Sequence, residues 1–551
     1  MNLTIRGKDL EYSNYSTLHD IARDFEGEEK DPIILAVVNG KLRELFHSPR
    51  EGATVDFLTT ATRIGHETYR RSCIMLFLTA VHNVTMGEGV DRVVLHFSVD
   101  AGFYFTIEGA RPVDQAFADQ IEAEMRRLVS MGLLFNKSSF STAEAQHLFH
   151  DLRLYDKEKL FATRLDSRVN VYTLDSYSDY FYGFMAFDTS VLKYFKLHLY
   201  EGGIVLQMPE RRNPSLVPSF RPYEKLFRER CEGERWARRQ KISTVGDLNE
   251  HIIDEGARRT ILVSEAMMDS RIASTARKII ERTDVRFVMV AGPSSSGKTT
   301  FAQKLGIQLA ARGLVPHIIS VDNYFRDRDD MPLDADGKRD FEGIDAIDIA
   351  AFNKDMTALL EGKTVRMPTY DFLLGRRVYR GETLTMSEGD ILIIEGIHCL
   401  NDALTVSMPA ESKFKIYISA LTQVNIDEHN RIAASDGRLL RRIVRDARTR
   451  GYAASSTLAL WDSVRSGEEK NIFPFQDTAD VFFNSALPYE IAVLKPYAEP
   501  LLFQVKPEDP GYFEARRLLK FLKYFIGVPS MELVPNTSLL REFIGGGCFR
   551  M

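Results

Sequence analysis

The chain has 551 residues, of which 44% are apolar and 27% charged. This balance excludes intrinsic disorder and collagen-like structure, and since one hydrophobic core stops growing at roughly 250 to 300 residues, we expect roughly two to four globular domains. The net charge of −6 gives the molecule as a whole no attraction for a nucleic-acid backbone, so any nucleic-acid contact must be local.

The cysteines and the apolar runs predict the cellular compartment. Cys73, Cys231, Cys399 and Cys548 lie far apart with no paired spacing, which argues against a disulfide framework or a thiolate zinc site. The first residues, MNLTIRGKDLEY, lack a basic head followed by a long apolar run, and an apolar stretch of about 18 residues does not occur. We therefore expect a cytoplasmic protein that is neither exported nor membrane-spanning.

Two small modules are predicted in the first part of the chain. Residues 1–62 alternate apolar and polar positions, and Asn39-Gly40 between two apolar runs is a strong hairpin signal, so this module is rich in strands. Residues 63–209 mix helical stretches, such as His66 to Val84 and PVDQAFADQIEAEMRRLVSMG, with strands such as DRVVLHFSV and AGFYFTI. The second module is therefore predicted to be of the α+β class.

A boundary and a larger α/β domain follow. The stretch RRNPSLVPSFRPYEK carries three prolines, so we expect residues 210–284 to form a linker and a helical segment. In residues 285–495 the apolar runs RFVMVAG, HIISV, DILIIEG and FKIYIS alternate with helical segments, which predicts a doubly wound parallel sheet. Residues 496–551 are expected to be a helical extension.

A phosphate-binding loop is the strongest motif in the sequence. It follows a predicted buried strand, precedes a predicted helix and consists of Gly292, Pro293, Ser294, Ser295, Ser296, Gly297, Lys298, Thr299 and the following Thr300. In such a loop, backbone N–H groups and the helix N-terminus surround the phosphates of ATP, the lysine bridges the outer phosphates, and the threonine hydroxyl binds Mg²⁺. The alternative, a purely structural glycine loop, does not account for this context. Because motors, GTPases and small-molecule kinases share the loop, other residues must identify the phosphate acceptor.

Two acidic residues are candidates for the catalytic centre. Asp322 follows the strand HIISV, and carboxyl ends of parallel strands are where ligands bind in open α/β sheets. There it would accept the proton of the acceptor hydroxyl, or else cap a helix or turn. Glu395 follows ILII in a strand that reads as buried, where a carboxylate needs a partner such as Mg²⁺ or a lysine. We expect Glu395 to be linked to the metal.

A basic helix is predicted after the last of these strands. It carries Arg438, Arg441, Arg442, Arg445, Arg448 and Arg450. These side chains would form either a solvated basic face or the group of donors that phosphoryl transfer needs for the charge on three equatorial oxygens. The residues alone leave both interpretations open.

The segment from about Val285 to Lys495 resembles uridine kinase. Six motifs match in order, namely GPSSSGKTT, SVDNYF, DFEGIDAID, MPTYDF, LIIEGIHCL and LLRRIVRDARTRG. By this resemblance Asp322 is the catalytic base and Glu395 the acidic residue near Mg²⁺. The resemblance also implies that Phe341, Glu342 and Tyr370 line the nucleoside site and that Arg442, Arg445 and Arg450 form a lid over the phosphates. The implied activity is transfer of a phosphate from ATP, or GTP, to the 5′-hydroxyl of a nucleoside, with uridine or cytidine as the first guess.

The nucleoside end departs from the family. Animal uridine kinases carry a base-contacting histidine where this chain has Gly375, and a second base-side arginine is replaced by Tyr452. Both changes remove polar contacts to the base, so the acceptor nucleoside is left open. The alternatives are another small-molecule kinase of this fold, such as a phosphoribulokinase-like or pantothenate kinase-like enzyme, or an RNA-binding regulatory ATPase.

The first two modules resemble parts of threonyl-tRNA synthetases. Residues 1–62 are similar to the TGS domain, a small β-grasp-like fold, through VNGKLREL and EGATVDFLT, and residues 63–209 are similar to the editing domain through HETYRRS, AGFYFTI and FKLHLYEGGIV. Of the four polar groups of the editing site only His66 is kept. Arg70, Phe181 and Met185 replace the other three, so neither a zinc site nor a hydrolytic centre of that type can form.

Two roles remain open for these modules. They would either bind RNA or a regulatory ligand, or serve as a structural platform for a homo-oligomer. Because no basic stripe is evident in this part of the sequence, the platform is favoured. His66 is then expected to be a cap or core residue, and His147 and His150 are expected on a helix surface.

Overall fold

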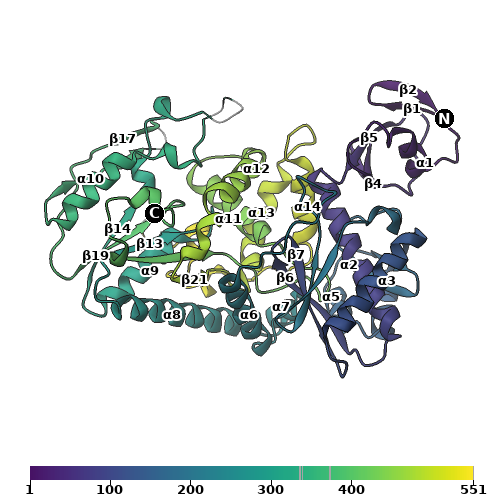
Figure 1. Ribbon diagram of the computed structural model, residues 1–551, viewed down its shortest axis with the longest axis horizontal. Helices are drawn as coiled ribbons and strands as arrows, with labels where there is room; N and C mark the ends of the chain where they lie inside the picture. Colours follow the sequence, from purple (N-terminus) through teal and green to yellow (C-terminus); the bar gives the residue numbers. More distant parts are fainter. Residues whose placement is uncertain (334–336, 338, 372–373, 550–551) are drawn as a thin grey trace. The chain divides into compact units, whose positions relative to one another are not determined.

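The computed structural model describes residues 1–333, 337, 339–371 and 374–549. The chain divides into two compact units, which are Met1–Phe227 together with Asn425–Arg431, and Arg228–Val424 together with Ile432–Met551. The first strands of the first unit lie at the purple end of the chain in Figure 1, and the sheet of the second unit contains β13, β14 and β19.

A small five-stranded sheet begins the first unit. Its order is β2-β1-β5-β3-β4, and β1 pairs in parallel with β5 while the other pairs are antiparallel. The predicted hairpin at Asn39-Gly40 is confirmed, since Val38 pairs with Lys41 and both turn residues have positive φ, 49° and 71°. The elements are β1 (Asn2–Ile5), β2 (Lys8–Glu11), α1 (Leu18–Ala22), β3 (Ile33–Val38), β4 (Lys41–Glu44) and β5 (Thr54–Thr59).

The rest of the first unit is an α+β arrangement with two further sheets. One has the order β11-β12-β7-β6 and the other β10-β9-β8, and both are antiparallel. Buried apolar residues of α2, α3 and these strands form one core. The elements are α2 (Arg63–Thr85), β6 (Arg92–Val99), β7 (Gly102–Glu108), α3 (Gln115–Met131), β8 (Asn136–Ser141), α4 (Thr142–Asp151), α5 (Tyr155–Ala162), β9 (Arg168–Leu174), β10 (Tyr177–Tyr180), β11 (Lys196–Tyr200) and β12 (Gly203–Gln207).

A distant segment of the chain, Asn425–Arg431, completes the first unit. Its His429 imidazole lies 2.6 Å from the Asp179 carboxylate, and its Asn430 amide donates to the Tyr180 carbonyl at 3.0 Å. Lys157 is fully buried beside them, 3.3 Å from Asp179 and 3.4 Å from Asp427. Burial opposes the charge of Lys157, but the surrounding aspartates hold its pKa well above the usual value, so this side chain stays charged.

The second unit contains a five-stranded parallel sheet of order β14-β19-β13-β20-β21. The predicted parallel α/β sheet is confirmed, and its central strand β13 is buried at every residue, as expected for a strand covered on both faces. Helix α9 packs against β13, β14 and β19. Because β13 has neighbours on both sides that come later in the chain, ligands are expected at its carboxyl end.

The elements that lead to and form the first part of this sheet region are α6 (Glu224–Arg239), α7 (Val245–Glu255), α8 (Arg258–Ile280), β13 (Phe287–Ala291), α9 (Lys298–Ala310), β14 (Val315–Ser320), α10 (Ile349–Leu360), β15 (Val365–Arg366), β16 (Thr369–Asp371), β17 (Arg376–Val378), β18 (Thr383–Leu384) and β19 (Asp390–Glu395). Those that follow are β20 (Lys413–Ser419), α11 (Ala434–Thr449), α12 (Ala454–Asn471), β21 (Val481–Asn484), α13 (Glu490–Phe503), α14 (Tyr512–Leu522) and α15 (Arg541–Ile544). Within the described ranges, every helix is too short or too polar to cross a bilayer.

Candidate active site

The loop 292–297 turns tightly between β13 and α9. A side chain at Gly292 would meet the Ile418 carbonyl oxygen at 1.9 Å, so only glycine fits beside β20. Ser295 and Gly297 have positive φ, 59° and 84°, and the chain then enters α9 at Lys298. These turns bring successive backbone N–H groups to the N-terminus of α9, where the helix dipole also favours an anion.

Two buried ion pairs hold this loop in place. The guanidinium of Arg438 donates to the Ser294 carbonyl at 3.2 Å and also pairs with Glu468, whose carboxylate accepts from the Ser294 N–H at 3.1 Å. Arg441, with no exposed side-chain area, donates to the Ser295 carbonyl at 3.3 Å and pairs with Glu490. Both polar groups of the Ser294 backbone are thus engaged, which fixes the loop before any phosphate arrives.

The first two residues of α9, Lys298 and Thr299, follow the loop directly, and Glu395 lies beside Thr299. The Lys298 ammonium donates to the Gly292 carbonyl at 3.0 Å and to the Pro293 carbonyl at 3.3 Å. The Thr299 hydroxyl donates to the Glu395 carboxylate at 3.5 Å, and Glu395 is the last residue of β19. A hydroxyl and a carboxylate at this separation are the oxygen ligands that Mg²⁺ prefers, so both residues fit its binding.

Asp322 is a partly buried carboxylate, Glu395 is a buried one, and both have raised pKa values. Burial raises the pKa of Asp322, against the attraction of Lys298, Arg450 and Arg445. Burial, and then the charge of Asp322, raise the pKa of Glu395 to about 7. Asp322 follows β14 in the turn Val321–Tyr324, and Ser320 at the end of β14 pairs with Glu395. The carboxyl ends of two neighbouring strands therefore bring both acids to the P-loop.

The arginines of α11 divide into two groups. Arg438 and Arg441 are buried in the ion pairs described above, so these two do not form a solvated face. Arg442, Arg445 and Arg450 gather around the Asp446 carboxylate at 3.3, 2.8 and 3.6 Å, and Arg442 also donates to the Ser294 hydroxyl at 2.8 Å. Burial, together with the neighbouring guanidinium of Arg445, lowers the pKa of both Arg442 and Arg450. An anion between these three arginines would relieve this repulsion.

The three residues expected to line the acceptor site, Phe341, Glu342 and Tyr370, lie in different surroundings. Burial raises the pKa of Glu342 to about 7, and its charge interacts with Arg442, Glu468, Asp322 and Lys298. Phe341 is 43% exposed, and Tyr370 packs edge-on against the Phe325 ring. Glu342 thus lies with the phosphate-binding groups. Phe372, in the motif MPTYDF, lies outside the described residues.

Gly375 and Tyr452 differ in their surroundings. Gly375 has φ 68°, and a side chain there would meet the Arg328 guanidinium at 2.7 Å. Its carbonyl accepts from the Arg328 N–H at 2.7 Å. The glycine is therefore required by the backbone and by Arg328, whereas Tyr452 is 53% exposed.

Two acidic residues near the P-loop were missed by the sequence analysis. Glu468 lies in α12 and Glu542 in α15, and the Glu542 carboxylate accepts from the Thr300 N–H at 3.3 Å and from its hydroxyl at 3.0 Å. Glu542 is 242 residues away from Thr300 in the sequence, and neither glutamate belongs to a recognised motif. No local pattern could have indicated either contact.

The four positions compared above with an editing site are filled by packed side chains in the first unit. Phe181 and Met185 belong to its apolar core, and the Arg70 guanidinium lies 4.1 Å from the centre of the Phe103 ring. The His66 Nε2–H donates to the Pro209 carbonyl at 2.9 Å, and burial, together with Arg70, lowers the pKa of His66 to about 4. His147 and His150 lie on the exposed surface of α4, as expected.

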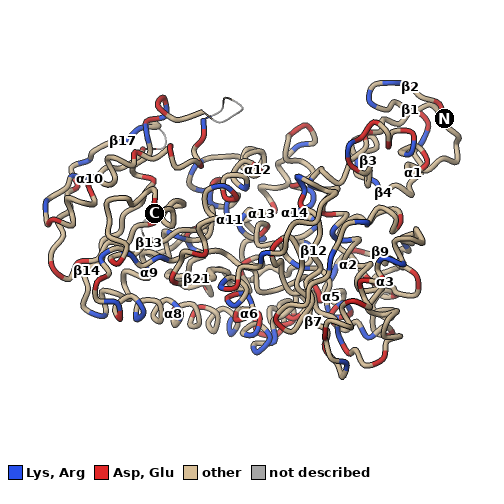
Figure 2. Tube along the Cα trace, viewed as in Figure 1, with Lys and Arg blue, Asp and Glu red and all other residues tan. Residues whose placement is uncertain are grey.

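The charged residues along the chain are mixed in sign. Lys and Arg (blue) and Asp and Glu (red) alternate over most elements in Figure 2, and α11 carries a concentration of blue. The arginines of α11 thus place positive charge near the P-loop, where it would attract an anionic ligand.

The second unit is similar to known kinases over about a third of the chain. Residues 287–491 match the Phosphoribulokinase / Uridine kinase family. The chain is 28% identical over 193 residues to a uridine kinase of Deinococcus deserti, covering 35% of this chain and 84% of the relative. It is 28% identical over 206 residues to a uridine kinase of Lactobacillus helveticus, covering 37% and 88%. A solved structure described as a possible uridine kinase from Bacillus stearothermophilus covers 39% of this chain and 98% of its own, at 18% identity and a TM-score of 0.27. The chain therefore carries a domain of this family with a P-loop kinase fold.

Proposed function

We propose that this protein is an ATP-dependent nucleoside kinase that transfers the γ-phosphate to the 5′-hydroxyl of a nucleoside. The observation that carries the proposal is the meeting of Lys298, Asp322 and Glu395 at the carboxyl ends of neighbouring parallel strands. Phosphoryl transfer needs little covalent chemistry from a protein, so positioning and charge stabilisation at such an edge are what an enzyme of this kind must supply.

The roles of the residues follow from their chemistry. Asp322 accepts the proton of the acceptor hydroxyl, since burial raises the pKa of this carboxylate and makes it a better proton acceptor, while Lys298, Arg450 and Arg445 favour its ionised form. Thr299 and Glu395 hold Mg²⁺, which neutralises phosphate charge when bound. Arg442, Arg445 and Arg450 act as the lid that donates to the transferring phosphate.

The acceptor site departs from the family pattern at Gly375 and Tyr452. Phe341, Glu342 and Tyr370 would line the nucleoside, while Gly375, which has a positive φ and lies against Arg328, supplies no side chain that reads the base. We therefore expect the ribose and the 5′-hydroxyl to be recognised more strictly than the base. A kinase of this type would accept several nucleosides, with uridine and cytidine to be tested first.

The test is a panel of nucleosides assayed with ATP and Mg²⁺ for nucleoside monophosphate, with Lys298→Ala as the inactive control. Product from at least one nucleoside, absent with the variant, supports the proposal. Product only from a sugar phosphate or from pantothenate would replace it with a different small-molecule kinase of the same family. Tight RNA binding with no phosphorylated product would indicate a regulatory ATPase.

The first unit is proposed to be a platform for a homo-oligomer. Its former editing positions are packed with apolar side chains or with Arg70, which supports a structural role over catalysis. The TGS-like, editing-like and linker segments 1–62, 63–209 and 210–284, and the carboxy-terminal extension 496–551, are proposed with the same boundaries. Sedimentation of the full chain, together with RNA binding at several salt concentrations, tests this, and salt-dependent RNA binding would favour the alternative.

A further inference from the structure

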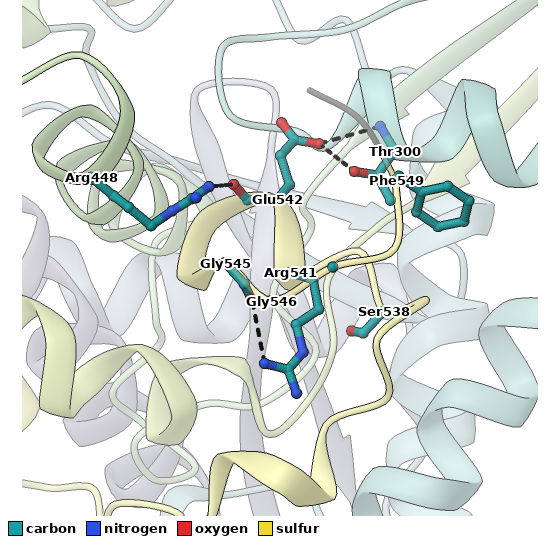
Figure 3. Close-up of a pocket in the computed structure, with 9 residues that line it drawn as sticks. Thr300, Arg448, Ser538, Arg541, Glu542, Gly545, Gly546 and Phe549 are labelled. Atoms are coloured by element: carbon teal, nitrogen blue, oxygen red, sulfur yellow. Dashed lines mark hydrogen bonds between the residues drawn. The ribbon is translucent and has the colours of Figure 1, made fainter.

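The carboxylate of Glu542 lies on the first turn of the P-loop helix. It accepts from the Thr300 N–H at 3.3 Å and from the Thr300 hydroxyl at 3.0 Å (Figure 3). Thr300 is the third residue of α9, and the first backbone hydrogen bond of this helix runs from Phe301 to Gly297, at 3.0 Å. The Thr300 N–H is therefore one of the helix N–H groups that lack a backbone partner and that a P-loop offers to phosphates.

The segment that carries Glu542 is held firmly. Arg448, near the end of α11, donates to the Glu542 carbonyl at 2.8 Å and to the Phe543 carbonyl at 3.0 Å. The Arg441 guanidinium lies 5.1 Å from the centre of the Phe543 ring. Arg541 donates to the carbonyls of Val534 at 2.6 Å and Gly545 at 3.2 Å. Glu542 is thus a largely buried residue, 8% exposed, in a segment that is fixed by several hydrogen bonds.

The space beside Glu542 is small. A cavity of about 210 Å³ is lined by Thr300, Arg448, Glu542 and the glycines 545–547, among others, and Figure 3 shows Glu542 reaching Thr300 from the carboxy-terminal segment. Sites for ligands of drug size usually have about 300 to 1,000 Å³. The cavity is smaller than this range, and residues of the segment 538–547 form most of its lining.

The charge of Glu542 opposes the same ligand. A carboxylate in hydrogen-bonding contact with a phosphate-binding amide uses the donor that the phosphate needs and repels its negative charge. Glu542 also adds to the charges that raise the pKa of Glu395, so its field already extends to the metal side of the site.

We propose that Glu542 is a built-in competitor of the donor nucleotide, and that ATP binds only when this side chain leaves Thr300. The inference rests on the proposed function, since it presumes that the P-loop binds ATP. Arg448 bonds two backbone carbonyls of the same segment, so a movement of the whole segment 538–547 would also free the end of α11, the helix that carries Arg442 and Arg445. Donor binding would in this way release the lid arginines to close on the phosphates.

The test compares the affinity of the full-length protein for ATP and for tripolyphosphate, both with Mg²⁺, by calorimetry. The variants are Glu542→Gln and Glu542→Ala, and Glu532→Gln is the matched control, because Glu532 is an exposed glutamate of the same extension. We expect at least fivefold tighter binding of both ligands by the two Glu542 variants and no change for Glu532→Gln. Glu542→Gln retains a carbonyl oxygen that can accept from Thr300, so this variant preserves the fold and removes only the negative charge.

The outcomes separate this inference from the proposed function. Equal or weaker binding by both Glu542 variants, while the wild type binds ATP, overturns the inference and leaves the proposed function standing. Tightening for ATP but not for tripolyphosphate also overturns it, because the competition would then concern the base. If the wild type and all variants bind no ATP, the proposed function fails and the inference fails with it. As a second readout, hydrogen exchange of residues 538–547 should rise when ATP is added to the wild type, and unchanged or slower exchange contradicts the displacement.

Discussion

Replacing Glu395 by glutamine should stabilise the protein, and the effect should depend on pH. The Glu395 carboxylate is buried at the end of β19, and burial first, then Asp322, raise its pKa from 4.5 to about 7, against the attraction of Lys298. Glutamine has nearly the same shape and carries no charge. The substitution therefore removes the cost of keeping this carboxylate ionised while leaving the packing in place.

The size of the effect follows from the two pKa values. Because the folded protein holds this proton more tightly than the unfolded chain, the stability linked to Glu395 is fully present below pH 4.5 and is lost as the pH rises through about 7. At 1.36 kcal/mol for each pKa unit, the loss at pH 8 is on the order of 3 kcal/mol. Glu395→Gln should therefore be more stable than the wild type by about this amount at pH 8, and nearly equal to it at pH 5.

Urea unfolding at both pH values without Mg²⁺ measures this difference. The free energy of unfolding of a domain of this size falls by about 3 kcal/mol per molar urea, so the urea midpoint of the variant should be about 1 M higher at pH 8. Glu382→Gln is the matched control, since Glu382 is an exposed glutamate of the same unit. Added Mg²⁺ should raise the midpoint of the wild type but not of Glu395→Gln. A variant that is equally or less stable than the wild type at pH 8 would refute the reasoning on the buried charge.

Three further predictions concern other residues. Asp322→Asn should still bind ATP but turn over about 10² to 10⁴ times more slowly, and retention of more than a tenth of the wild-type rate in a steady-state assay would exclude Asp322 as the base. Arg441→Met should destabilise the protein by about 3 to 5 kcal/mol, because it leaves the buried Glu490 without its partner, and a urea midpoint equal to that of the wild type would contradict this. The first unit should bind no zinc and should not deacylate seryl-tRNA, because Arg70 stays protonated, Phe181 has no donor atom and the Met185 sulfur is too soft for zinc. Metal analysis of the purified protein and a deacylation assay check this, and stoichiometric zinc at His66 would be the contrary result.

Local signals in the sequence were sufficient to predict much of the fold. The Asn39-Gly40 turn specifies a hairpin through its two positive φ values, and the apolar runs of β13, β19 and β20 specify strands buried in a parallel sheet. The P-loop was found for the same reason, because its glycines, lysine and threonine are contiguous and lie between a strand and a helix. Each of these features is set by residues close together in the chain. The prediction that the run in β14 is buried was wrong, because β14 lies at the edge of the sheet and exposes Val315 and Ile318.

The remainder depends on contacts between distant residues. The pairing of Arg438 with Glu468 and the contact of Glu542 with Thr300 join different helices, and no periodicity indicates them. The segment Asn425–Arg431 lies between β20 and α11 in the chain but folds with the first unit through buried groups such as His429 and Asp179. Burial also changed the interpretation of the arginine-rich helix, since Arg438 and Arg441 turned out to be interior groups that hold the P-loop.

The most direct measurement is the fate of the γ-phosphate of labelled ATP when the wild-type protein is incubated with a nucleoside and Mg²⁺. The account predicts that the label appears on the 5′-oxygen of the nucleoside, with one nucleoside monophosphate formed for each ADP, and that Lys298→Ala forms neither product. Release of ADP with the label found only in inorganic phosphate, at a rate that no nucleoside changes, would contradict it.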